Sequence, residues 1–195
     1  MSEFWFYFNL GLKHVLDINA YDHVLFMIAL VVPFTFKNWK DVLLLVTLFT
    51  IGHTMALILS VYNVVGVKAS LVEFLIPVTI LLTAIYNLAG AGKPAGKNIT
   101  VSAVVTLFFG LIHGLGFANY FKMIIKGNAE GKLLPLLEFA LGIEASHIIV
   151  VTAVLLLALL VQHLLKFSRR DWMLVASAFV IGVALPMVIE SEIWQ

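Results

Sequence analysis

The chain has 195 residues, of which 62% are hydrophobic and only 12% are charged, and its mean hydropathy is +1.06. A soluble domain is close to half apolar and about a quarter charged, so the composition excludes a soluble protein and predicts one integral membrane domain over residues 1–195. The absence of cysteine excludes disulfides and thiolate metal sites, and a net charge of +1 with scattered basic residues gives no sign of a nucleic-acid surface.

The N-terminal segment is expected to form a short helix and not a secretory signal. Residues 1–12 contain no Lys or Arg, and no small-residue cleavage site follows them. Residues 5–8 are four consecutive aromatic residues, a type that favours the membrane–water interface. We therefore predict an interfacial or re-entrant helix over residues 4–19.

Six further stretches are apolar enough to be spanning helices, which need about 20 mostly apolar residues. They are expected at about residues 21–36, 42–65, 71–91, 99–121, 133–165 and 172–189. The first is short, and the fifth is long enough to be tilted or broken near Gly142. The predicted fold class is an all-α membrane protein, a bundle of six transmembrane helices preceded by the N-terminal helix.

Loop charge predicts the orientation of this bundle. The loops after the first, third and fifth spans hold seven Lys and Arg residues, and the opposite face holds five. Because cytoplasmic loops carry the excess of basic residues, both termini are expected outside the cytoplasm. The expected location is the inner (plasma) membrane of a bacterium.

Ionisable side chains inside the spans indicate the candidate site, because such groups are costly in a membrane and face the bundle interior. At a rise of 1.5 Å per residue, His53 lies about 15 Å from the N-terminal face, His113 about 13 Å and Glu144 about 16 Å. Three groups at one depth predict a shared site. A dense polar segment approaches it from the same face, with His14, Asp17, Asp22 and His23.

The residue types indicate a metal. Glu144 and His147 are three residues apart, which places both on one face of a helix, and four-helix metal proteins use such a pair. Imidazole and carboxylate groups without thiolate suit Zn, Ni, Co, Fe or Cu. The predicted metal ligands are His14, Asp17, Asp22, His23, His53, His113, Glu144 and His147.

Several of these residues have a simpler interpretation. A single membrane histidine such as His53 is more often an interhelical hydrogen-bonding group, and Asp17 can serve only to orient His14. His163 is expected to be a solvated interfacial residue. His14 and His23 are nine residues apart, so one straight helix, at about 100° per residue, would point them to opposite sides. Both are ligands only if the chain bends near Asn19 and Ala20.

Four motifs carry a resemblance to a known family. They lie at residues 11–26, 47–54, 109–118 and 141–147, in order along nearly the whole chain. Together they resemble the HupE/UreJ membrane proteins. The resemblance implies a nickel or cobalt permease whose metal is handled by His14, Asp22, His23, His53, His113 and Glu144. The sequence departs from the family in two respects. His147 stands where the family pattern leads us to expect Gln, and some members begin with a cleaved signal, which is not expected for residues 1–12 here.

The leading hypothesis is therefore a transition-metal permease or metal-handling membrane protein, with a Ni, Co or Zn ion and the lipid bilayer as partners. The far half of the bundle offers only hydroxyls and Asn87, so an ion path there would require helix movement. The alternative is an intramembrane zinc hydrolase. In it, His53, His113 and His147 hold a zinc ion that activates a bound water, and Glu144 or Asp22 is the general base. A structural or sensing role without metal stays open, as does a homo-oligomer.

Overall fold

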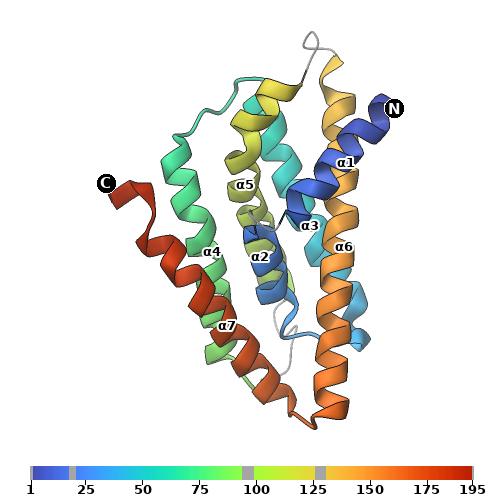
Figure 1. Cartoon of the computed structure of the whole chain (residues 1–195), viewed down its shortest axis with the longest axis vertical. Coiled ribbons are helices and arrows are strands. Elements are labelled where there is room, and N and C mark those ends of the chain that lie inside the picture. The colour runs from blue at the N-terminus through green and yellow to red at the C-terminus, as the bar shows by residue number, and fades with distance from the viewer. Residues whose placement is uncertain (1, 18–20, 94–98, 126–130, 195) are drawn as a thin grey trace.

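The computed structural model describes residues 2–17, 21–93, 99–125 and 131–194, and these are helical with no strand among them (Figure 1). Short 3-10 turns at Phe36–Asn38 and Glu192–Trp194 accompany seven α-helices. The helices are α1 (Glu3–Leu16), α2 (Asp22–Val31), α3 (Trp39–Val61), α4 (Ala69–Ala89), α5 (Ile99–Ile124), α6 (Leu133–Leu164) and α7 (Arg169–Ile189).

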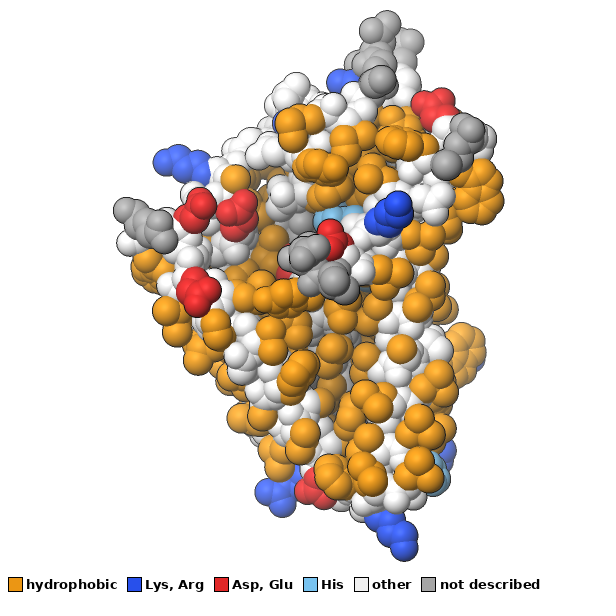
Figure 2. All heavy atoms as spheres, viewed as in Figure 1, with side chains coloured by type: hydrophobic (Ala, Val, Ile, Leu, Met, Phe, Trp, Pro, Cys, Tyr) orange, Lys and Arg blue, Asp and Glu red, His pale blue; other side chains and the backbone are white. Residues whose placement is uncertain are grey.

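Five of these helices are long and apolar enough to cross a membrane, namely α3 to α7. Figure 2 shows hydrophobic side chains over most of the visible face, with charged side chains at its lower end and in its upper half. Between them is a broad band in which no charged side chain is visible, as expected for a surface in lipid. The predicted count of six spans is not confirmed, because the stretch at 21–36 contains only the ten-residue helix α2. Pro33 follows the end of α2 by two residues, and proline cannot continue the hydrogen bonding of a helix.

A helix forms in the N-terminal segment, at Glu3–Leu16 where residues 4–19 were predicted, and it packs along the first half of α6 (Figure 1). A Cβ atom added to Gly11 would overlap the carbonyl oxygen of Phe139, and one added to Gly142 would overlap that of Phe8. The two backbones are therefore in direct contact, as small residues permit in membrane bundles. Of the tilt or break considered near Gly142, the break does not occur, since α6 is continuous, and this glycine instead provides the contact with α1.

Helices α3 and α5 approach each other in the same way. A Cβ at Gly52 would overlap the carbonyl oxygen of Leu107, and Cβ atoms at Gly110 and Gly114 would overlap those of Phe49 and His53. Three glycines spread over this interface keep the two backbones close along about two turns of helix. This contact brings the middle of α3, with His53, against the middle of α5, with His113.

The remaining helices complete the bundle around α2. Helices α4 and α7 pack against each other, and α2 contacts α4, α6 and α7. In Figure 1, α2 lies in the centre of the molecule, between α4 and α7 on one side and α6 on the other. The ten residues of α2 are therefore held inside the bundle, and seven of them are buried.

Candidate metal-binding site

Five of the six histidines converge in the bundle, each from a different helix. His23 on α2 is central, with ring centroids 4.7 Å from His14, 5.4 Å from His53, 5.3 Å from His113 and 5.8 Å from His147. We refer to these five residues as the histidine cluster. His23, His53, His113 and His147 are each at most 1% exposed.

The interruption between α1 and α2 brings the first two histidines together. His14 lies on the last turn of α1, which ends at Leu16, and His23 lies on the first turn of α2, which begins at Asp22. The bend predicted at Asn19 and Ala20 lies outside the described residues. The two separate helices nevertheless allow both imidazoles to face one place, which a single straight helix would prevent.

Within the cluster, two overlapping groups have the spacing of metal ligands. One is His14, His23 and His53, the other is Asp22, His23 and His113, and in each the ligand atoms lie within 4.8 Å of one another. Two metal–nitrogen bonds of about 2.1 Å span at most about 4.2 Å. A small inward movement of the side chains would therefore close either group around one ion.

Asp22 sets the orientation of the central histidine. Its Oδ1 accepts a hydrogen bond from the backbone N–H of His23 at 2.9 Å and lies 3.2 Å from Nδ1 of the same residue. A neutral imidazole has one N–H and one lone pair, so Nδ1–H donates to the carboxylate. The lone pair of His23 is then on Nε2, which is buried without a hydrogen-bond partner.

A threonine orients His147. Nδ1 of His147 lies 3.0 Å from Oγ1 of Thr50, and that hydroxyl donates to the carboxylate of Glu144. Because the Thr50 hydrogen is used by Glu144, Nδ1 of His147 must be the donor in the first contact. Its Nε2 therefore carries the lone pair, and it too is buried without a partner. This is the arrangement by which outer carboxylates fix the tautomer of a metal-binding histidine.

A threonine also orients His113, but the contact is made by Nε2 instead of Nδ1. Its Nε2 lies 3.2 Å from Oγ1 of Thr79, whose hydrogen is donated to the carbonyl oxygen of Ile76 at 2.7 Å. Nε2–H of His113 is thus the donor, and Nδ1 carries the lone pair. This nitrogen is buried without a partner, and His113 belongs to the group with Asp22 and His23.

The cluster as a whole contains an unusual number of unsatisfied nitrogens. Buried polar atoms in proteins nearly always have a hydrogen-bond partner, because an unpaired one costs about 1–3 kcal/mol. Six buried imidazole nitrogens of the cluster have none: Nε2 of His14, His23 and His147, Nδ1 of His113, and both nitrogens of His53. The donor set fits a cation that accepts imidazole lone pairs, as the borderline divalent metals do.

Comparison with known proteins places the chain in a family. The family model described as HupE / UreJ protein matches residues 1–191, which is almost the entire chain. The chain belongs to the HupE/UreJ family. No curated protein and no solved structure matches it.

Membership of the HupE/UreJ family makes this a nickel- or cobalt-related protein of bacterial membranes, and the resemblance found in the motifs is confirmed. The family gives no specific support for zinc.

Two of the predicted site residues and one predicted ligand group differ from the sequence-based expectation. Asp17 is exposed and belongs to neither ligand group, although Asp22 nearby belongs to one. Glu144 accepts hydrogen bonds from the hydroxyls of Thr47 and Thr50, and Thr50 connects it to His147 of the cluster. Among the described residues, His53, His113 and His147 do not form a ligand group of their own.

Sequence reasoning overlooked the two threonines that orient the cluster. Thr50 lies three residues before His53 on α3, one helical turn away, and Thr79 lies on α4, which supplies no histidine. A buried hydroxyl at helical spacing from a buried histidine is the signal that would have indicated Thr50. No comparable signal exists for Thr79, because its partner His113 is on another helix.

Proposed function

We propose that the histidine cluster binds Ni²⁺ or Co²⁺ as cargo, and that the protein is a permease or hand-over protein for this cation. The observation that carries the proposal is the six unpartnered imidazole nitrogens buried together. Family membership supports nickel or cobalt over other metals that imidazole binds well. A divalent cation would satisfy several of these nitrogens at once, which no group in the described part of the chain does.

The two overlapping ligand groups suggest how the cation is passed on. In the proposed path, the ion is held first by His14, His23 and His53 and then by Asp22, His23 and His113. His23 is common to both groups, so the ion keeps one ligand while it exchanges the others. His147 lies beside His23 and supplies a further nitrogen. Asp17 is not assigned a ligand role, and Glu144 is proposed to orient His147 through Thr50.

We further propose that α1 and α2 together form a sixth, discontinuous crossing of the membrane. They contribute 14 and 10 helical residues, about 36 Å of helix in total at 1.5 Å per residue. Transporters commonly place their ion sites where a spanning helix is broken near the middle of the membrane. Here the interruption is flanked by His14 on one side and by Asp22 and His23 on the other.

The zinc hydrolase hypothesis is not carried forward. It needs His53, His113 and His147 as joint ligands of one zinc ion, with Glu144 or Asp22 as base. In the described part of the chain these histidines are not grouped in that way, and Glu144 is engaged by two threonine hydroxyls. Nothing in the comparisons favours it.

Metal binding by the purified full chain tests the proposed function. Equilibrium dialysis against Ni²⁺, Co²⁺ and Zn²⁺ should give stoichiometric binding of nickel or cobalt. His53→Ala removes two unpartnered nitrogens and should lower the affinity by more than about tenfold, whereas His163→Ala, at the exposed end of α6, should leave it unchanged. Absence of stoichiometric binding, or an equal effect of both substitutions, would contradict the proposal.

A further inference from the structure

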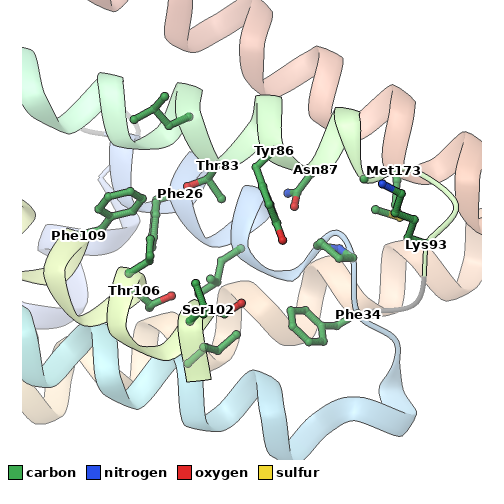
Figure 3. A pocket seen from close by; sticks show the side chains of 17 residues that line it. Phe26, Phe34, Thr83, Tyr86, Asn87, Lys93, Ser102, Thr106, Phe109 and Met173 are labelled. Carbon is green, nitrogen blue, oxygen red and sulfur yellow. The ribbon is translucent and has the colours of Figure 1, made fainter. Parts of the chain in front are cut away.

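A separate cavity lies next to the histidine cluster in the other half of the bundle. Its volume is about 420 Å³, and it is bounded mainly by α2, α4 and α5. Figure 3 shows Phe26 and Phe109 at one end and Lys93 at the other, with Thr83, Tyr86 and Asn87 of α4 facing Ser102 and Thr106 of α5. No histidine lines it, so it is distinct from the site described above.

Two polar stripes connect this cavity to the cluster. On α4, Thr79, Thr83 and Asn87 follow one another at intervals of four residues, which places them on one helix face. Thr79 contacts His113, and the other two line the cavity. Asn87 is eight residues beyond Thr79, so the stripe covers about 12 Å along the helix.

The second stripe lies on the neighbouring helix α5. Ser102, Thr106 and His113 are spaced by four and seven residues, so they share one face of that helix. Ser102 and Thr106 line the cavity from this side. Both stripes therefore begin at His113 and lead into the same space, away from the end of the bundle that bears the N-terminus.

An aromatic barrier separates the cavity from the cluster. Phe26 lines the cavity, is fully buried, and has its ring centroid 5.2 Å from that of His113 and 4.6 Å from that of Phe49. It follows His23 by three residues and Asp22 by four, so barrier and ligands share one face of α2. A displacement of this short helix would move Phe26 and two ligands together.

We infer that the cavity is water-filled and is the compartment that the cation enters when it leaves His113, with Phe26 as the barrier between the two. The inference rests on the proposed function. Hydroxyl and amide oxygens are suitable partners for the water around a hydrated divalent ion, and the volume exceeds that of several waters at about 30 Å³ each. A lipid acyl chain is the competing occupant, but it would leave the hydroxyls of Tyr86, Ser102 and Thr106 facing hydrocarbon. Thr83 and Asn87 already donate hydrogen bonds to backbone carbonyls.

The natural absence of cysteine makes the cavity directly testable. Single Thr106→Cys and Ser102→Cys variants of the full chain are reconstituted in vesicles and treated with a charged, membrane-impermeant thiol reagent on one face at a time. The reagent on the face of Lys93 should modify both positions at least about tenfold faster than Thr152→Cys, an exposed position on the apolar helix α6. Modification from the opposite face should not occur. No modification from either face would mean a lipid-filled or dry cavity and would overturn the inference.

A second experiment asks whether the cation uses this space. Ser102→Leu with Thr106→Leu fills the cavity, and Val104→Leu, 64% exposed on the same helix, is the control. Uptake of Ni²⁺ into vesicles should fall at least about tenfold, while Ni²⁺ affinity of the purified protein stays within about twofold. Undiminished uptake by the filled variant would overturn the inference. Failure of the unaltered protein to bind Ni²⁺ would instead remove the proposed function, and the thiol labelling would still report on water in the cavity.

Discussion

The hydroxyl of Thr50 lies 3.0 Å from Nδ1 of His147 and at the same time donates to Glu144. This single side chain on α3 connects two residues of α6 that are already on one face of their helix. Its position leaves only Nε2 of His147 free to bind a cation. A carboxylate, a hydroxyl and an imidazole thus form a chain that ends in the histidine cluster.

Thr50→Val should weaken metal binding without removing a ligand. Valine keeps the shape of threonine but cannot connect Glu144 to His147, and loss of such an orienting partner typically costs about 10–100-fold in affinity. Ni²⁺ affinity and the optical spectrum of bound Co²⁺ should both change. Thr152→Val, exposed on α6, is the matched control and should alter neither. An unchanged Co²⁺ spectrum in the Thr50 variant would show that the hydroxyl does not orient a ligand.

The two aspartates beside the interruption between α1 and α2 should differ sharply in effect. Asp22→Asn removes the carboxylate that belongs to a ligand group and orients His23, so the affinity for Ni²⁺ should fall by about tenfold or more. Asp17→Asn changes an exposed residue outside both groups and should have little effect. Titration of both variants with Ni²⁺ checks this. If both variants lost Ni²⁺ affinity equally, Asp17 would be a ligand after all.

Gly142→Ala should destabilise the protein and also weaken metal binding. Its Cβ would overlap the carbonyl oxygen of Phe8, so α1 must move away from α6 and carry His14 with it. Overpacking of this kind typically costs about 1–3 kcal/mol. Thermal unfolding in detergent and Ni²⁺ titration measure the two effects.

The control for this substitution is Gly182→Ala on α7, where an added Cβ meets nothing within 4 Å. Alanine is favoured over glycine inside a helix by about 0.5–1 kcal/mol, so this variant should be at least as stable as the unaltered protein. If the two variants unfolded at the same temperature, the close contact between α1 and α6 would not be important for stability.

His147→Gln should make the bound cation exchange faster. Glutamine cannot supply an imidazole lone pair, so one nitrogen close to His23 is lost while the two ligand groups remain. Stopped-flow chelation of Ni²⁺ should show faster release and a weaker equilibrium affinity. Slower or unchanged release would indicate that His147 has only a packing role.

The depth of the histidines was predictable because it depends only on helix rise and on where the apolar stretches end. His53 on α3 and His113 on α5 are on helices that run in the same direction, and counting residues from one face placed both at one level, where the structure has them near His23. Rotation about a helix axis is harder to predict near a helix end. Asp17 directly follows α1, and its outward position could not be inferred from its depth.

Contacts with another helix explain why Glu144 and Gly142 differ from the predictions. Glu144 was paired with His147 from their spacing, but its carboxylate is taken by two threonines of α3, which are distant in sequence. Hydropathy joined α2 to the residues beyond Pro33, although the helix ends before them. Gly142 suggested a possible break when α6 was considered alone. The structure shows that a glycine is needed there because the backbone of α1 lies against it.

The packing of α1 on α6 has a consequence for how the protein is made. Ser146 of α6 donates a hydrogen bond to the carbonyl oxygen of Leu12, and Gly11 and Gly142 hold the two backbones together, so His14 acquires its position only when α6 is present. During synthesis α1 emerges first, and its partner follows more than a hundred residues later. His147 is also on α6. The full set of imidazoles therefore assembles late in membrane insertion, and a nascent chain would not yet have the complete site with which to capture a metal ion.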